Sequence, residues 1–138
     1  MVDLSRFLKA QEPVYATVLA ELRSGRKRTH WMWFIFPQIR GLGHSAISRR
    51  FAIRDFSEAK AYLTHPILGA RLKECVAAVL EHREKTAHQI FGTPDDLKFC
   101  SCLTLFQAIA PEEPLFRQAL NLFYDGRSDP ETIRILGD

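Results

Sequence analysis

Two histidines in the first third of the chain are the side chains best suited to proton transfer. His30 precedes an aromatic run, and His44 follows a Gly-Leu-Gly turn. Histidine changes its charge near neutral pH and is the most frequent general acid or base in enzymes. Asp96, in the GTPDDLK segment, offers a carboxylate that could orient one of these rings. We therefore take His30, His44 and Asp96 as candidate catalytic residues.

The same histidines lack the spacing of a metal site. The sequence contains no H-x-x-x-H or H-E-x-x-H pattern, and no cysteine lies near His30 or His44. The three cysteines include no C-x-x-C pair, and we expect them to be reduced. Glycine-rich phosphate motifs of the Rossmann and P-loop types are also absent. We predict neither a metal ion nor a bound cofactor.

Residues 22–54 differ from the rest of the chain in charge. This segment contains no Asp or Glu but carries eight of the 19 lysines and arginines. Converging side chains would give the folded protein a cationic region that attracts anions. For Arg26, Lys27 and Arg28 the alternative is a solvated helix end, where cations complement the helix dipole. The sequence leaves both interpretations open.

The aromatic run WMWFIF at residues 31–36 lies inside this basic segment and leads into a loop with Pro37, Arg40 and two glycines. Flat rings beside cations suit a ligand that has a π-face and a phosphate, and exposed N–H groups of such a loop can meet an anion. The alternative is that the rings belong to the core, because large aromatic side chains bury much area. The candidate ligand-binding residues are Lys27, Trp31, Trp33, Gln38, Arg40, Gly41, Gly43 and Lys98.

A second polar cluster is formed by Asp95, Asp96 and Lys98. Thr93 with Asp96 three residues later is also typical of a capping box at a helix start. Both interpretations place the cluster at the beginning of a helix. Whether it meets the cluster at residues 30–44 is not decided by the sequence.

The elements that must position these side chains are helices. A stripe of apolar residues at helical spacing follows Pro13, a longer one follows Pro66, and the apolar segment 97–109 is expected to be central in the core. Residues 31–36 could form a buried strand, but no equally clear partner strand exists elsewhere and a lone strand cannot satisfy its backbone groups. They are therefore expected to form a short buried helix or an extended segment that crosses the core. We predict an all-α, single-domain irregular bundle of about six to eight helices over residues 1–138.

Hydrophobic residues make up 46% of the chain, which is enough for one core at this length. The longest apolar run, residues 31–36, is far shorter than the roughly 20 residues that span a bilayer. The first residues do not resemble a secretory signal. We therefore expect a cytoplasmic protein with no membrane partner, and we leave its oligomeric state open.

Four segments together resemble a known bacterial family. They are GRKRTHWMWFIFPQIRGLGHS, LSRFLKAQ, YLTHPILGARL and FGTPDDLKFCSCLTLF. The family is called domain of unknown function 1810, and the resemblance runs over nearly the whole chain, with residues 30–38 as its most specific part. It implies an all-α single domain and no particular activity. The calpastatin-like label sometimes given to the family implies a disordered inhibitor, which this globular composition does not support.

Three hypotheses for function follow from these observations. The first is a binding site for an anionic, nucleotide-like small molecule, with catalysis undecided. The second is nucleic-acid binding through the basic residues between 23 and 54, and the third is a protein-interaction module that uses an exposed part of the aromatic run. We prefer the first, because the cations are spread among turn residues and histidines and not gathered on one helix face.

Overall fold

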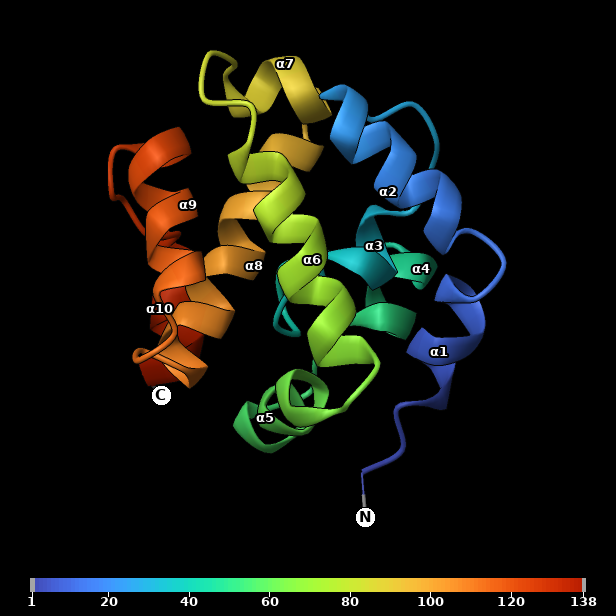
Figure 1. Ribbon diagram of the computed structural model, residues 1–138. Coiled ribbons are helices and arrows are strands. Elements are labelled where there is room, and N and C mark those ends of the chain that lie inside the picture. Colours follow the sequence, from blue (N-terminus) through green and yellow to red (C-terminus); the bar gives the residue numbers. More distant parts are fainter. Residues whose placement is uncertain (1, 138) are drawn as a thin grey trace.

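The computed structural model describes residues 2–137, which form ten α-helices and no strand (Figure 1). The predicted all-α fold is confirmed. The number of helices exceeds the predicted six to eight, because three of them have only four to six residues, too few to show a period in the sequence. The helices are α1 (Ser5–Gln11), α2 (Tyr15–Ser24), α3 (Met32–Ile35), α4 (Ala46–Phe51), α5 (Phe56–Thr64), α6 (Leu68–Leu80), α7 (Ala87–Phe91), α8 (Asp95–Ile109), α9 (Pro114–Tyr124) and α10 (Pro130–Gly137).

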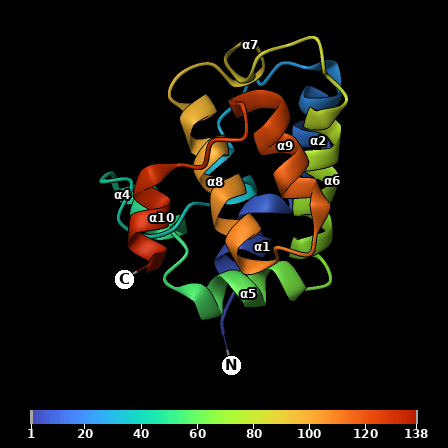
Figure 2. The ribbon, with the colours of Figure 1, turned by 90° about the vertical axis from the view of Figure 1, so that its left-hand side faces the viewer.

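The central element is α8, as predicted from its apolar composition. Phe99, Leu103 and Phe106 are fully buried, and α5, α7, α9 and α10 all pack against this helix (Figures 1 and 2). Its first turn, by contrast, is polar and only partly buried. The same helix therefore anchors the core at one end and presents Asp95, Asp96 and Lys98 at the other.

A second long helix, α6, packs against α2, α5 and α9. The corner between α5 and α6 depends on Gly69. A Cβ atom at this position would lie 2.0 Å from the carbonyl oxygen of Leu63. Only glycine permits this close approach of the two backbones.

The aromatic run forms the short helix α3 in the interior, which confirms one of the two predicted alternatives. Trp31 and Phe36, which flank α3, are 1% and 0% exposed. The amide of Gln11 donates a hydrogen bond of 2.7 Å to the carbonyl of Phe34, so the end of this short helix has a buried partner. Most of the rings in this run are therefore core residues.

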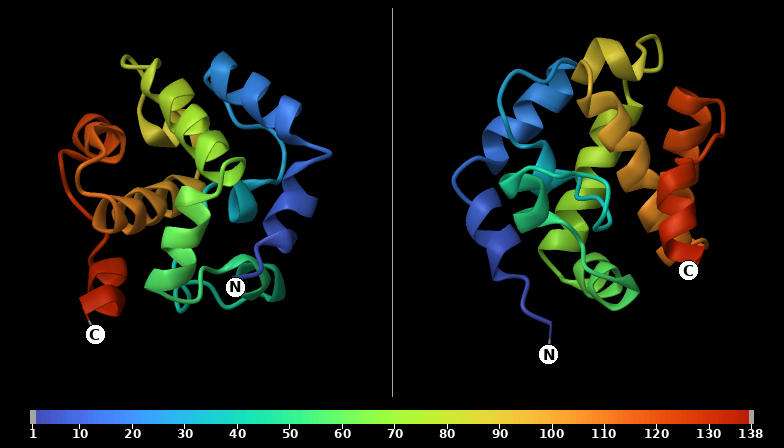
Figure 3. Two further views of the ribbon diagram at one scale, coloured as in Figure 1. Left: turned by 60° about the horizontal axis from the view of Figure 1, so that its bottom comes forward. Right: turned by 180° about the vertical axis from the view of Figure 1, so that it is seen from behind.

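The chain between α3 and α5 is held by an isolated parallel bridge between Ile39 and Ile53. The Arg40 N–H donates to the carbonyl of Ile53, and the Ile53 N–H donates to the carbonyl of Gln38, both at 2.8 Å. The loop before α4, α4 itself, the start of α8 and α10 lie on the same side of the molecule (Figure 3, right). Residues from distant parts of the sequence thus share one face.

Candidate functional site

Trp33 is the point at which the two predicted polar clusters meet. It is half-buried on α3, and the Lys98 ammonium from α8 lies 5.1 Å from the centroid of its ring. The indole also lines a hollow of about 10 Å³ together with Gln38, Gly43 and Ser48, which is room for about one water molecule. Residues from the 30–44 and 95–98 segments therefore lie next to each other in the folded protein.

A second lysine joins this site from the loop after α2. Lys27 places its ammonium 5.1 Å from the ring centroid of Trp31 and 2.9 Å from an Asp95 carboxylate oxygen. The other oxygen of Asp95 lies 3.7 Å from the Lys98 ammonium. Each lysine thus has an indole ring and a shared carboxylate as neighbours. We call Lys27, Trp31, Trp33, Asp95 and Lys98 the indole–lysine cluster.

The two lysines differ in how much of their bonding capacity is used. The Lys27 side chain is 7% exposed, and its ammonium also donates 2.6 Å to the carbonyl of Thr29. Lys98 is 21% exposed, and within residues 2–137 its only acidic partner is Asp95. An ammonium group has three donors. Lys98 therefore keeps donors for a ligand, whereas Lys27 is mostly satisfied within the protein.

The loop that carries Lys27 is fixed by the buried carboxylate of Glu21. This group accepts hydrogen bonds from the backbone N–H groups of Arg28 and Thr29, from the Thr29 hydroxyl and from the indole N–H of Trp31, at 2.7 to 3.1 Å. Burial raises the pKa of Glu21, but these four bonds outweigh burial and lower the pKa to about 2. These hydrogen bonds tie the loop to α2.

Trp31 does not offer a surface to a ligand. It is 1% exposed, and its ring N–H is engaged by Glu21. The prediction of Trp31 as a ligand-contact residue is therefore wrong, and the alternative that its ring belongs to the core is correct. Its contribution to the site is indirect, through the ring that faces Lys27.

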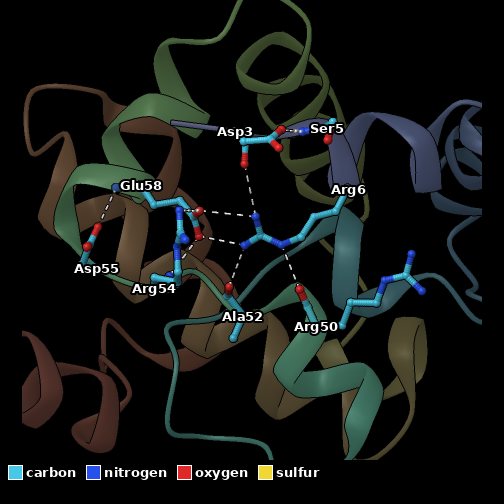
Figure 4. Close-up of polar contacts among 8 residues, drawn as sticks. All are labelled: Asp3, Ser5, Arg6, Arg50, Ala52, Arg54, Asp55 and Glu58. Atoms are coloured by element: carbon cyan, nitrogen blue, oxygen red, sulfur yellow. Dashed lines mark hydrogen bonds and ion pairs between the residues drawn. The ribbon is translucent and has the colours of Figure 1, made fainter. Parts of the chain in front are cut away.

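The segment on the other side of Trp33 is fixed by a second buried carboxylate. Glu58 is 1% exposed and binds the guanidinium groups of Arg6 and Arg54 at 2.8 and 3.1 Å (Figure 4). Arg6 also donates to the carbonyl oxygens of Arg50 and Ala52 at 2.8 and 2.9 Å. Burial raises the pKa of Glu58, but the arginines outweigh burial and hold the pKa below its usual range. This network holds the end of α4 in place.

The two glycines of the predicted anion loop have steric roles. Gly41 has a φ of +108°, and a Cβ atom at Gly43 would lie 2.5 Å from that of Ser48. The N–H of Arg40 is already bonded to the carbonyl of Ile53. The Arg40 side chain is exposed and has no acidic partner within residues 2–137. The exposed Arg40 side chain and the partly buried Gln38 remain candidates for contact with a ligand.

The candidate catalytic residues are not brought together. His30 and His44 are exposed, and no contact joins either ring to Asp96. Asp96 instead lies 3.6 Å from His88 of α7, whose Nδ1 is 3.0 Å from the Thr93 hydroxyl. The Thr93–Asp96 capping box is also wrong, because α8 begins without a side-chain cap.

Glu21, which binds Trp31, and His88, which lies beside Asp96, were not named in the sequence analysis, and Asp95 was named only as a member of the 95–98 polar cluster. Glu21 and His88 have no local signal, since their partners are fixed only by the tertiary fold. Asp95 had a signal in its spacing of three residues from Lys98 on one helix, which places both on the same face. That spacing shows the pairing with Lys98 but not the pairing with Lys27.

Two larger grooves lie away from the indole–lysine cluster. One, of about 700 Å³, lies between the α5–α6 corner and the start of α9, and the other, of about 590 Å³, lies between α1 and α5. His65 lines both grooves, and its Nδ1 accepts the N–H groups of Ile67 and Leu68 at the start of α6. None of the predicted site residues lines either groove.

Residues 2–137 contain neither a candidate metal site nor a candidate membrane span. No three His, Cys, Asp or Glu side chains are grouped so that they could hold a metal ion. No helix in this part of the chain has the length and apolar character needed to cross a membrane.

The ten helices and the single core define an all-α, single-domain protein. A family model described as "Protein of unknown function (DUF1810)" matches residues 1–136, and the chain belongs to this family, which confirms the resemblance noted in its sequence. Its fold is similar to the crystal structure of the conserved hypothetical protein Rv1873 from Mycobacterium tuberculosis. The identity is 48%, the TM-score is 0.97, and the match covers 99% of this chain and 97% of that chain. No curated protein matches the sequence.

Proposed function

We propose that the protein binds a small anion at the indole–lysine cluster, with Lys98 as the principal contact. The observation that carries the proposal is the position of the Lys98 ammonium, over the ring of Trp33 and only loosely paired with Asp95. A partly buried ammonium beside an aromatic face binds an anion more strongly than a fully solvated one, because less water competes for it. Gln38, at the neighbouring hollow, supplies an amide.

The surroundings of Trp33 narrow the class of ligand. Lys98 lies over its ring, and the hollow that Trp33 lines has a volume of only about 10 Å³. A nucleobase stacked on this indole would need far more space than one water molecule occupies. The ligand is therefore expected to bind through a phosphate or carboxylate group, and a nucleotide would bind through its phosphates without stacking on Trp33.

The proposal concerns binding and does not include a catalytic step. His30 and His44 have no carboxylate partner within residues 2–137, so the geometry gives no support to an acid–base pair there. The burial of the aromatic run also gives little support to the interaction-module hypothesis. Residues 31–36 include four Trp and Phe side chains, and of these only Trp33 is more than 9% exposed.

The proposal is tested by titrating the protein with inorganic phosphate, pyrophosphate, AMP and ADP. Binding is followed by the NMR signals of the Lys98 amide and the Trp33 indole N–H. Lys98→Met keeps the aliphatic part of the side chain and removes the charge, so Kd should rise roughly tenfold. Lys60→Met, at an exposed lysine of α5, is the matched control and should bind as the wild type does. Equal Kd values for the two variants would sink the proposal.

Nucleic-acid binding is a second candidate, favoured by a different observation. Arg26, Arg28, Arg40 and Arg49 are exposed, and none has an acidic partner in the part of the chain that the structure describes. If these four arginines contact phosphates, affinity for a short DNA duplex should fall about a hundredfold between 50 and 200 mM salt. Fluorescence anisotropy measures this dependence. A flat response would rule the candidate out, and Lys98→Met should leave it unchanged.

A further inference from the structure

The position of Asp95 bears on the charge of the anion that the site accepts. Its two carboxylate oxygens lie 2.9 Å from the ammonium of Lys27 and 3.7 Å from that of Lys98. The protein thus already holds one negative charge between its two cations. The three groups together carry a net charge of one positive unit.

We infer that Asp95 limits the negative charge of the ligand, an inference that rests on the proposed anion site. An anion that approaches Lys98 also approaches the Asp95 carboxylate, which repels it. The repulsion grows with each additional charge on the ligand, whereas the number of free ammonium donors stays the same. Asp95 therefore favours a singly or doubly charged group over a polyphosphate.

The partial burial of the cluster makes this effect stronger than on an open surface. Asp95 is 20% exposed, and Lys27 is 7% exposed. Charges in such surroundings are screened less by water and salt than fully exposed charges are. Lys27 cannot easily turn away from Asp95, because it is also bonded to Thr29 and packed on Trp31. The carboxylate is consequently held where it opposes an incoming anion.

Asp96 provides a matched comparison at the next position of the chain. It carries the same charge in the first turn of α8 and therefore interacts similarly with the helix dipole. Its neighbour is His88, at 3.6 Å, and not a lysine of the cluster. Replacing Asp96 with Asn removes one charge from the helix start without removing the carboxylate that lies between Lys27 and Lys98.

The experiment compares the affinities of the wild type, Asp95→Asn and Asp96→Asn for inorganic phosphate and pyrophosphate by the same NMR titration. In the wild type, pyrophosphate should bind no more than about threefold more tightly than phosphate. In Asp95→Asn, pyrophosphate affinity should rise roughly tenfold and phosphate affinity much less, and both changes should exceed those in Asp96→Asn. Thermal unfolding of each variant shows that it is folded.

The outcomes separate this inference from the proposed function. Phosphate binding by the wild type, with no preferential gain for pyrophosphate in Asp95→Asn, overturns the inference and leaves the anion site intact. Absence of binding in all three proteins overturns the anion site and the inference together. If Asp95→Asn does not fold, the inference is tested by the ratio of the wild-type affinities for pyrophosphate and phosphate. A preference for pyrophosphate well above threefold contradicts the inference.

Discussion

Trp31 and Trp33 are two residues apart, and their surroundings give them different roles. Trp31 is buried and bonded to Glu21, whereas Trp33 is half-buried and faces Lys98. The sequence alone does not distinguish them, because both belong to one aromatic run and both precede the same loop. The difference arises from the carboxylate of Glu21, ten residues before Trp31, which accepts a hydrogen bond from the Trp31 indole and not from that of Trp33. At the scale of single residues, Glu21 determines the shape of the site.

The stability of the protein should therefore depend on the ionisation of Glu21. Its pKa is lowered from 4.5 to about 2 in the folded protein, so folding favours the ionised form. A lowered pKa contributes stability that is fully present above about pH 4.5 and is lost as the pH falls toward 2. The shift corresponds to a contribution of about 3 kcal/mol.

Urea unfolding of Glu21→Gln at two pH values measures this contribution. At pH 6 the variant should be less stable than the wild type by about 3 kcal/mol, and near pH 2.5 most of the difference should disappear. Glu81→Gln, at an exposed acid beyond the end of α6, should follow the wild type at both pH values. A loss in Glu21→Gln that is equally large at both pH values would contradict the assigned cause.

At the scale of elements, the longer helices could be predicted and the shorter ones could not. The apolar stripes before Gly25 and after Pro66 predicted α2 and α6, because each helix is long enough to repeat its pattern. Helices of four to six residues, such as α4 and α7, are too short to repeat a pattern, although Ser45 caps α4 and a capping box of Thr86 and Gln89 begins α7. The polar cluster at 95–98 was placed correctly at a helix start.

The sequence predicted which residues belong to the candidate site better than it predicted which of them are in contact. Trp33, Gln38 and Lys98 were all named from their residue types and neighbours. Their meeting could not be predicted, because Trp33 and Lys98 are 65 residues apart and only the packing of α3 near α8 joins them. The capping box failed for a local reason, because α8 begins at Asp95 with Pro94 at the N-cap position, and the Thr93 hydroxyl lies 3.0 Å from a ring nitrogen of His88.

The α5–α6 corner gives a test at this scale. Gly69→Ala should destabilise the protein by about 1–3 kcal/mol, because the added methyl group overlaps the carbonyl of Leu63. The same substitution at Gly137 of α10 meets no atom within 4 Å and should change stability by less than about 0.5 kcal/mol. Thermal unfolding compares the two variants. Equal effects would show that helix propensity, and not steric overlap, governs Gly69.

At the scale of the whole molecule, acids from outside residues 22–54 partly neutralise that segment. Glu74 lies near Arg23, Asp95 binds Lys27, and Glu58 binds Arg54. The charge asymmetry of the sequence is therefore smaller in the folded protein than in the chain. What remains within this segment, in the part of the chain that the structure describes, is the set of arginines at 26, 28, 40, 49 and 50, which have no acidic partner.

The network around Glu58 predicts energetic coupling between distant parts of the chain. Arg6→Ala should cost about 3 kcal/mol, because it leaves a buried carboxylate with only the exposed Arg54 as its cationic partner. The double variant Arg6→Ala/Glu58→Gln should be more stable than the sum of the single effects by at least about 1 kcal/mol. Urea unfolding of all four proteins measures the coupling.

Lys9→Ala, at an exposed lysine of the same helix α1, serves as the control and should change stability by less than about 0.5 kcal/mol. Strict additivity of the Arg6 and Glu58 effects would mean that the contacts shown in Figure 4 do not stabilise the fold as a unit.

The chain contains two tryptophans, and both belong to the indole–lysine cluster. Nearly all of the intrinsic fluorescence of the protein therefore originates in the indole–lysine cluster. Acrylamide should quench the emission of Trp33 but not that of Trp31, because only Trp33 is accessible to a quencher in solution. Large collections of metabolites can thus be screened on the unlabelled protein. A ligand that occupies the anion site should change the fraction of tryptophan emission that acrylamide quenches.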